Sequence, residues 1–334
     1  MRIGVVVAQD FWLHFRDIYA ALQEDHDTVT FRERKWPFQL MSERMNRILC
    51  RHDLGQFMRR NHVTFFEWAE YLFVTATQLR KCSRIVVRLH LHELWDFAPF
   101  ANWEQVDRVI FVSRAMQRKF LDKFPEMDGR TMVVHNGVSL QKFRWKSRSF
   151  RGVIGTLGRI EPHKRVYDLI ITLYELRKRG YDLVLDIGGD CTEARYRRYS
   201  YEVQSLVERL GLQPFVRFRG HVDNTPAWFE DVDIFVSNSC SEGLQVALLE
   251  AMASGCHCLS HWWDGAEEIL PEDHLYWSDR ELQEKIALFC DASVESREES
   301  CSTMRGIVEQ RFDIDAKKLI VKRIIEDVAG NDRR

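Results

Sequence analysis

Short apolar runs rich in β-branched residues recur along the chain, and most are followed by a stretch with helical periodicity. Runs of this kind are typical of strands buried in a parallel sheet. One helix face is indicated where apolar residues recur at i, i+3, i+4 and i+7, as they do at Val166, Leu169, Ile170 and Leu173. The predicted strands are residues 3–7, 63–67, 85–89, 109–112, 132–134, 153–157, 183–187, 216–218 and 234–237.

A polar segment divides this alternation into two cycles. Residues 141–151 resemble an interdomain linker, and a new strand–helix cycle begins after them. Alternating strands and helices imply parallel sheets covered on both faces, so the fold class is α/β with two Rossmann-like domains. We expect an N-terminal domain over 1–145, a C-terminal domain over 146–315 and a final helix over 316–334 that could pack back toward the first domain. Ligands of such sheets bind at the carboxyl ends of strands, which makes a cleft between the domains the expected site.

Composition changes the picture chiefly through charge. The 334 residues have a net charge of −2, which argues against a general nucleic-acid binder. Residues 1–150 carry 24 Lys and Arg against 17 Asp and Glu, whereas residues 151–334 carry 24 against 33. The basic half suggests an anionic acceptor or the cytoplasmic leaflet of a membrane as partner, with an ordinary solvated surface as the alternative. Its early cations are Arg32, Arg34, Lys35, Arg44, Arg47, Arg51, Arg59 and Arg60.

The same composition indicates a cytoplasmic protein, peripheral on the inner face of a membrane if it binds one. No run of about 18 apolar residues exists, and the first residues form a strand pattern rather than a signal peptide. The eight cysteines contain no C-x-x-C pair and are expected to be reduced thiols. Cys256-His257-Cys258 lacks a second ligand pair, so no metal site is predicted.

Two cations follow the strand over 153–157. Arg159 and Lys164 lie in the loop Gly158-Arg159-Ile160-Glu161-Pro162-His163-Lys164, between a strand and a helix. An Arg fork and a Lys charge at that place suit a diphosphate. The alternative is two solvated loop cations.

A pair of carboxylates follows the strand over 234–237. Glu242 and Glu250 are eight residues apart in Ser241-Glu242-Gly243-Leu244-Gln245-Val246-Ala247-Leu248-Leu249-Glu250. Gly243 and the preceding strand place Glu242 in a loop, and Glu250 falls inside the next helix. The pair could hold two ends of one extended ligand, while the helix N-terminus offers unpaired N–H groups to an anion. The alternative is an amphipathic helix with one stray Glu.

The order of these motifs resembles that of a known family. Gly-Arg-x4-Lys, Gly220 after a strand, Asp231-Val232-Asp233 and Glu-Gly-x6-Glu-Ala-Met-Ala-Ser-Gly are together similar to retaining GT-B glycosyltransferases of family GT4. The resemblance is strong over 152–271, fainter over 60–140 and weak over 1–60. It implies a GT-B fold, two Rossmann-like domains facing a central cleft.

The resemblance also implies residue roles. Arg159 and Lys164 would hold the donor diphosphate, and Glu250 would bind the nucleotide ribose. Glu242 would bind sugar hydroxyls, helped by backbone N–H groups of Gly243, Leu244 and Gln245, and the base would lie near His221 and Val222. The catalytic residues would be His90 and Glu242, with His92 as a competitor for the role of His90. Family members often carry a Gly-Gly loop after the first strand, where this chain has Asp10, which could polarise an acceptor hydroxyl or cap a helix.

The predicted function is therefore retaining transfer of a sugar from a UDP- or GDP-linked donor to a hydroxyl of a glycan or lipid-linked saccharide. Fixed cations and a helix N-terminus can stabilise the leaving diphosphate, so the nucleotide sugar is expected as co-substrate without a metal or other cofactor. The alternatives are a catalytically silent GT-B module that binds a nucleotide, and a GT-B phosphorylase or epimerase. A plain Rossmann dehydrogenase is disfavoured because no G-x-G-x-x-G follows the first strand.

Overall fold

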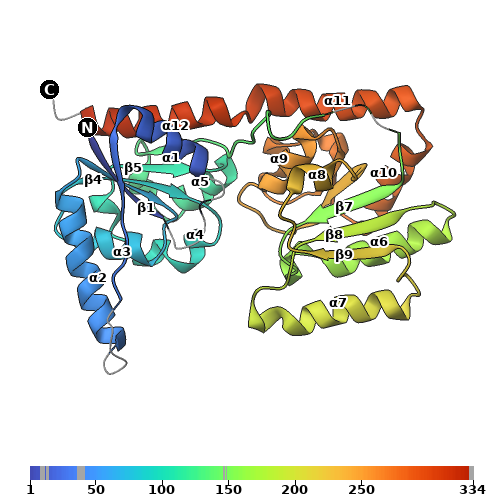
Figure 1. Cartoon of the computed structure of the whole chain (residues 1–334), viewed down its shortest axis with the longest axis horizontal. Helices are drawn as coiled ribbons and strands as arrows, with labels where there is room; N and C mark the ends of the chain where they lie inside the picture. The colour runs from blue at the N-terminus through green and yellow to red at the C-terminus, as the bar shows by residue number, and fades with distance from the viewer. Residues whose placement is uncertain (8–11, 13–14, 36–41, 146, 148, 331–334) are drawn as a thin grey trace. The chain divides into compact units, whose positions relative to one another are not determined.

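The computed structural model describes residues 1–7, 12, 15–35, 42–145, 147 and 149–330. The chain divides into two compact units (Figure 1). The N-terminal unit comprises Met1–Asn136 together with the segment that begins at Ile314, and the C-terminal unit comprises Gly137–Asp313. Each unit is a six-stranded parallel sheet with helices on both faces.

The N-terminal sheet has the strand order β2-β1-β3-β4-β5-β6. Its registers align the carboxyl ends of neighbouring strands, because Val7 pairs with Glu67 and Glu67 pairs with Arg88. The strands are β1 Arg2–Val7, β2 Asp27–Thr30, β3 Val63–Glu67, β4 Arg84–Leu89, β5 Arg108–Phe111 and β6 Thr131–Val133. The helices are α1 Arg16–Asp25, α2 Ser42–Arg59, α3 Tyr71–Thr77, α4 Glu93–Asp96, α5 Arg114–Leu121 and α12 Ile314–Gly330.

The C-terminal helix α12 belongs to the N-terminal unit. Its apolar face joins the core of that unit, where Val321 and Ile325 pack with Phe15 and Phe65. An ion pair between Lys322 and Asp25 and a 2.7 Å contact between His26 Nε2 and Glu326 Oε1 link it to the end of α1 and the residue after it. Within the segment separated above as 316–334, the described residues of α12 are thus part of the first core.

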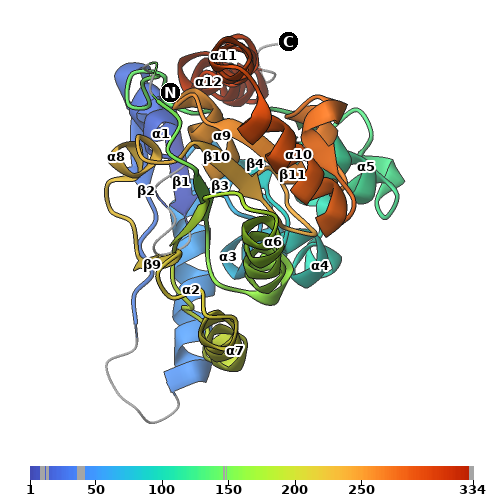
Figure 2. The ribbon, with the colours of Figure 1, turned by 90° about the vertical axis from the view of Figure 1, so that its right-hand side faces the viewer.

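The C-terminal sheet has the order β12-β11-β10-β7-β8-β9. One core cluster unites side chains of α6, α7 and α10 with those of the strands. Figure 2 shows the ribbon of these helices from the side. The strands are β7 Val153–Leu157, β8 Val184–Gly188, β9 Val216–Gly220, β10 Ile234–Ser237, β11 His257–His261 and β12 Leu275–Tyr276. The helices are α6 Val166–Lys178, α7 Arg197–Arg209, α8 Thr225–Phe229, α9 Val246–Ala253, α10 Asp279–Asp291 and α11 Val294–Arg311.

The division between the units falls at Asn136, earlier than the sequence boundary at 145, and the physical reason is packing. The Phe143 ring meets Phe229 with centroids 6.0 Å apart, and the Phe143 carbonyl accepts a hydrogen bond from Arg305. The indole of Trp145 lies against Gly255, where a Cβ would come within 1.8 Å of the ring. Residues of the expected linker are therefore part of the C-terminal unit.

Candidate functional site

The carboxyl ends of β7, β8 and β9 are held together by backbone hydrogen bonds between their loops. Gly158 N donates to Gly188 O at 3.0 Å, and Gly189 N donates to Gly220 O at 2.7 Å. Gly189 has a φ of +113°, and a Cβ there would lie 2.0 Å from Gly158 O. Only glycine allows these loops to approach so closely, and the approach gathers the loops that carry the predicted donor-site residues.

Arg159, in the loop after β7, forms ion pairs with two carboxylates. Arg159 Nε lies 3.1 Å from Glu161 Oε1, and Nη1 lies 3.3 Å from Glu193 Oε1. The Arg159 side chain is 53% exposed, whereas that of Glu161 is buried. The guanidinium is therefore oriented by two anions and remains accessible to a ligand.

Lys164 and Glu242, 78 residues apart in sequence, form an ion pair. Lys164 Nζ lies 2.5 Å from Glu242 Oε1, and both side chains are mostly buried. A second link joins the same two loops, since Cys240 N donates to His163 O at 2.9 Å. Burial lowers the pKa of His163, and the charge of Lys164 acts in the same direction. The structure thus brings together the two motifs that the sequence analysis selected separately.

The loop from Glu242 leads directly into α9. Gly243, Leu244 and Gln245 are buried, and Gln245 is the residue before the first helical turn. The Gln245 side chain does not cap the helix, and its buried Oε1 has no hydrogen-bond partner in the described part of the chain. The positive end of the α9 dipole therefore lies beside Glu242, which suits an anionic ligand.

Glu250 lies in the second turn of α9, as predicted, and it is partly buried. Burial raises the pKa of its carboxyl to about 7, although the charge of Lys142 acts in the opposite direction. No hydrogen bond or ion pair to the Glu250 side chain occurs among the described residues. Burial therefore disfavours the ionised form of this carboxyl, and hydroxyl groups of a ligand that donate hydrogen bonds to it would stabilise that form.

The remaining donor-side residues follow β9. His221 is exposed and its Nε2 lies 3.5 Å from Asp223 Oδ1. Val222 packs against Gly188, where a Cβ would lie 3.0 Å from the Val222 methyl group. The structure places both at the same sheet edge as Arg159. Asp233, at the amino end of β10, is used structurally, because its buried carboxylate accepts hydrogen bonds from the N–H groups of Arg151 and Val153 at 2.9 Å.

In the N-terminal unit, His90 follows β4 and is buried against β3. Its Nε2 lies 3.0 Å from Glu67 Oε1, and the same oxygen accepts a 3.0 Å hydrogen bond from Arg88 Nη1. The His90 ring stacks on Trp68 with centroids 3.8 Å apart. Trp68 has a φ of +83°, a strained value for a bulky residue. Glu67 and Trp68 therefore fix the orientation of the imidazole.

His92 differs from His90 in exposure. Its side chain is 47% exposed and its Nε2 lies 3.2 Å from Glu70 Oε1. Burial alone would lower the pKa of His92, but the hydrogen bond to Glu70 and the charge of Glu93 outweigh it and raise that pKa. Of the two histidines that the sequence left open, His90 is the buried and oriented one. Asp10, the third predicted residue on this side, lies outside the described residues.

Three residues of this cluster were missed in the sequence analysis: Glu67, Trp68 and Glu93. Glu93 is fully buried, and its Oε1 accepts hydrogen bonds from the N–H groups of Ala69 at 3.4 Å and His90 at 3.3 Å. A signal was present, because Glu67 ends an otherwise uncharged strand run and Glu93 closes the sequence His90-Leu91-His92-Glu93. A charged side chain at the end of a buried apolar strand is expected to need a polar partner, because an unpaired buried charge is unfavourable.

Comparison with known proteins agrees with the motifs. Residues 151–289 match the family model of glycosyl transferases group 1. A GDP-mannose-dependent phosphatidylinositol monomannoside mannosyltransferase from Mycolicibacterium smegmatis is 27% identical over 266 residues, covering 70% of this chain and 65% of that protein. The GtfA subunit of a peptide N-acetylglucosaminyltransferase from Streptococcus agalactiae is 26% identical over 161 residues, covering 47% of this chain and 30% of the relative. The chain therefore spans less than two thirds of these relatives.

Solved structures match over almost the full chain. HepE of Anabaena, in complex with UDP and glucose, has a TM-score of 0.79 at 18% identity and covers 97% of this chain and 99% of its own. A sucrose-phosphate synthase from Thermosynechococcus elongatus has a TM-score of 0.77 at 14% identity, covering 98% and 99%. These likenesses show the predicted GT-B fold. The part of this chain that is similar to the glycosyl transferases group 1 family is residues 151–289.

Proposed function

We propose that this chain is a hexosyltransferase that moves a sugar from a nucleotide-diphospho-sugar, UDP- or GDP-linked, to a hydroxyl group of an acceptor. The observation that carries the proposal is the Lys164–Glu242 ion pair beside the N-terminus of α9. It places a cation for a diphosphate next to a carboxylate for sugar hydroxyls, within the region that matches the family. A nucleotide sugar is supported by the HepE structure, which holds UDP and glucose, and by the mannosyltransferase named for GDP-mannose.

In this proposal Lys164 and Arg159 bind the donor diphosphate. When the bond between the sugar and the diphosphate breaks, negative charge develops on the leaving oxygen, and fixed cations together with the α9 dipole stabilise it. The pairing with Glu242 holds Lys164 in place before the donor arrives. A bound diphosphate would replace Glu242 as the ion-pair partner of Lys164. The Glu242 carboxylate could then accept hydrogen bonds from the sugar.

Glu250 is proposed as the ribose ligand. Ribose offers two adjacent hydroxyl donors, and a carboxylate accepts from both. Its raised pKa shows that the ionised carboxyl is poorly stabilised without a ligand, so each hydroxyl that donates to it gains in strength. His221 and Val222 would lie near the base at the same sheet edge.

The stereochemistry and the absence of a metal are further parts of the proposal. The acceptor oxygen forms the new bond to the sugar carbon on the face that the diphosphate leaves, so the configuration is retained. The hydroxyl proton passes to the departing diphosphate oxygen, and no side chain acts as nucleophile. Two cations and a helix N-terminus would supply the electrostatic stabilisation otherwise given by a metal. His90, oriented by Glu67, would lie near the sugar.

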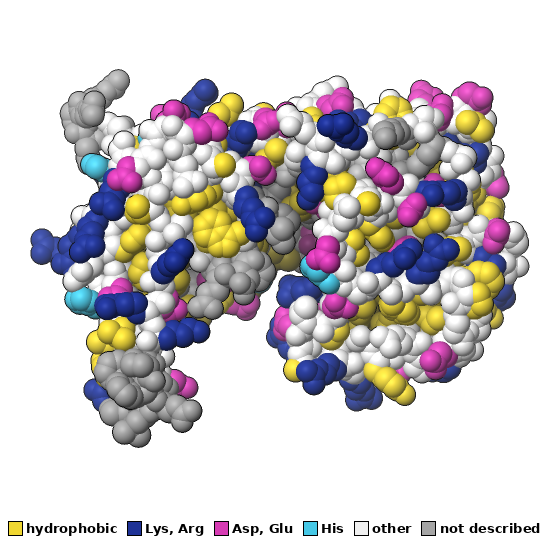
Figure 3. Space-filling view, viewed as in Figure 1, with side chains coloured by type: hydrophobic (Ala, Val, Ile, Leu, Met, Phe, Trp, Pro, Cys, Tyr) yellow, Lys and Arg dark blue, Asp and Glu magenta, His cyan; other side chains and the backbone are white. Residues whose placement is uncertain are grey.

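Our proposal for the acceptor is based on the positive charge of the N-terminal unit. The arginines Arg44, Arg47, Arg51 and Arg59 are all exposed on α2, and Figure 3 shows Lys and Arg side chains spread over the visible face of the N-terminal unit. We propose a glycan or lipid-linked acceptor and a peripheral place on the inner face of an anionic membrane. None of the helices in the described residues is long and apolar enough to cross a bilayer. Salt-sensitive sedimentation with vesicles of phosphatidylcholine and phosphatidylglycerol tests the membrane part, and no sedimentation would refute it.

The transfer itself is tested with a panel of UDP- and GDP-linked sugars, by release of nucleotide and by thermal shift. Lys164→Ala and Glu242→Ala are expected to lower the rate at least about 100-fold, the usual effect of removing one group that stabilises a developing charge. Lys178→Ala and Glu208→Ala, which change exposed residues on α6 and α7, are the matched controls. Full activity in either site variant, or no transfer and no hydrolysis of any donor by the wild type, would contradict the proposal. The second result favours a silent nucleotide-binding module.

A further inference from the structure

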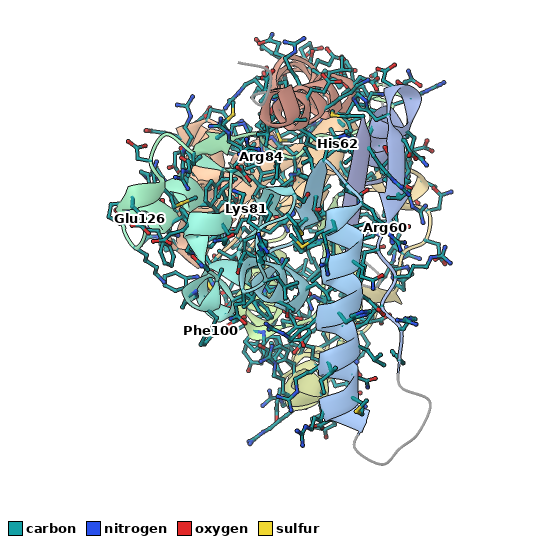
Figure 4. All side chains as sticks on the ribbon, turned by 90° about the vertical axis from the view of Figure 1, so that its left-hand side faces the viewer. Arg60, His62, Lys81, Arg84, Phe100 and Glu126 are labelled. Carbon is teal, nitrogen blue, oxygen red and sulfur yellow. The ribbon has the colours of Figure 1, made fainter. Side chains whose placement is uncertain are left out.

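A groove of about 340 Å³ lies in the N-terminal unit, and none of the residues placed in the donor site or in the His90 cluster lines it. It runs beside the edge strand β2 and the segment that follows it, and α2 forms its opposite wall. Four of its lining residues are arginines: Arg2, Arg32, Arg34 and Arg60. Figure 4 views this side of the unit and shows Arg60 at the end of α2.

The positive charge of the groove is only partly compensated. Arg34 binds Asp53 through two hydrogen bonds, of which Nε to Oδ2 is 2.6 Å long. Arg2 Nε lies 3.4 Å from Asp27 Oδ2. Arg32 and Arg60 have no ion-pair partner among the residues that the structure describes. Two uncompensated guanidinium groups thus border one cavity whose single acidic lining residue, Asp53, is already bound.

Other cations nearby are arranged differently. Lys81 and Arg84, also labelled in Figure 4, share the carboxylate of Asp107 at 2.9 Å and 3.1 Å. Asp107 partly compensates their charge, and its Oδ2 also accepts a hydrogen bond from the N–H of Ile85. The one carboxylate that lines the groove, Asp53, already binds Arg34. Arg60 therefore lacks an ion-pair partner among the described residues, whereas Lys81 and Arg84 have one.

One buried polar atom of the groove lining lacks a partner among the described residues. Asn61 is 4% exposed, and its Nδ2 donates to Phe57 O at 2.8 Å, but its Oδ1 has no hydrogen bond in the described part of the chain. The buried Nε of Arg2, in contrast, faces the Asp27 carboxylate at 3.4 Å. Gly4 makes room for Asn61, since a Cβ at that position would lie 2.5 Å from its Nδ2. Buried polar groups are normally satisfied, so the unpaired Asn61 Oδ1 is what a missing ligand would leave.

Charges on an edge strand can also serve to prevent pairing with other sheets. That purpose is met by side chains that project into water, and it requires neither a cavity nor buried donors and acceptors at its floor. The groove therefore needs a ligand that carries an oxyanion for the guanidinium groups and a hydroxyl donor for Asn61. The ring of Phe57, in edge contact with Phe31 at 5.4 Å, adds an apolar wall for a sugar ring.

We infer that this groove binds a phosphate-bearing sugar. Guanidinium forks bind phosphate oxygens bidentately, and Asn61 accepts a hydrogen bond from a ring hydroxyl. That the bound sugar is part of the acceptor rests on the proposed function. That the groove binds a phosphate-bearing sugar does not depend on the proposed function.

The experiment is calorimetric titration of the full chain with glucose 6-phosphate, with inorganic phosphate and glucose as partial probes. Arg32→Gln with Arg60→Gln is expected to weaken binding of glucose 6-phosphate at least tenfold. The control Arg209→Gln with Arg323→Gln removes the same charge from exposed residues on α7 and α12 and should leave affinity within twofold. Asn61→Ala should weaken glucose 6-phosphate but not inorganic phosphate, and circular dichroism verifies its fold.

Three results would overturn the inference: no binding of glucose 6-phosphate by the wild type, an equal loss in the control variant, or Arg32- and Arg60-dependent binding to phosphatidylglycerol vesicles alone. The last would assign the groove to a lipid headgroup. Thermal shift with UDP and GDP on the same variants separates this inference from the proposed function. A chain that binds glucose 6-phosphate but no nucleotide refutes only the function, and the reverse refutes only the groove.

Discussion

Replacing Glu250 with Gln should change how the stability of the protein depends on pH. Burial raises the pKa of this carboxyl to about 7 from the ordinary value of 4.5, and Lys142 only partly offsets that effect. The unfolded chain loses the proton near pH 4.5, whereas the folded chain keeps it until about pH 7. Between these values the folded state therefore holds more protons than the unfolded state.

The sign and size follow from proton linkage. Where the folded state binds more protons, the free energy of unfolding falls as pH rises. One pH unit between the two pKa values corresponds to about 1.4 kcal/mol, so the wild type loses about 3 kcal/mol by the time pH exceeds 7. Glu250→Gln has no proton to lose, so this part of the pH dependence should vanish in the variant.

The assay is urea unfolding of wild type and Glu250→Gln across pH 5 to 8, followed by circular dichroism. The variant should gain about 2–3 kcal/mol relative to the wild type over this interval. Glu208→Gln, which removes the same charge from an exposed position, measures the effect of net charge alone. If the difference between wild type and Glu250→Gln is constant across the interval, the reasoning about this carboxyl is wrong.

The same group predicts how pH acts on nucleotide binding. If ribose hydroxyls donate to the ionised carboxylate, only the deprotonated chain binds well. With a pKa near 7 in the free chain, the dissociation constant for UDP or GDP should rise about tenfold from pH 8 to pH 6. Glu250→Gln should bind more weakly at pH 8 and lose this dependence. An unchanged dependence in the variant would assign the titration to another group.

Further predictions concern the loops and the buried charges. Gly189→Ala should destabilise the C-terminal unit by more than about 3 kcal/mol, because strain at positive φ adds to a clash with Gly158 O. Gly211→Ala, with a φ of +66° and open space around it, isolates the strain and should cost about 1 kcal/mol in the same urea titration. Glu67→Gln should cost about 3–5 kcal/mol, since it leaves the buried guanidinium of Arg88 poorly compensated; a loss under about 1 kcal/mol in thermal or urea unfolding would contradict that pairing.

Much of the fold was predictable because strands buried on both faces leave continuous apolar runs. The run at β7 and the motif after it could be recognised without any knowledge of tertiary contacts. Edge strand β2, Asp27–Thr30, could not, since it is short, half exposed and contains two threonines and an aspartate. The boundary near 145 was misplaced for a related reason. Phe143 and Trp145 are ordinary linker residues until contacts with distant Phe229 and Gly255 define their unit.

The residues of the candidate site also fall into two groups: those that local sequence pattern could place and those that depend on contacts with distant residues. Local pattern was enough to place Glu242 in a loop and Glu250 on a helix, because a strand, a glycine and an apolar period mark those positions. It was not enough for Glu67, because its partners Arg88, in the next strand, and His90, just after that strand, meet it only once the two strands align in register. A buried carboxylate is unfavourable without such partners, so the sequence could mark Glu67 as a charge at the end of an apolar run but could not name its partners. The cations of the β2 groove are the opposite case, since Arg32 and Arg60 were visible early as charge, but the sequence could not show that they border one cavity and lack carboxylate partners among the described residues.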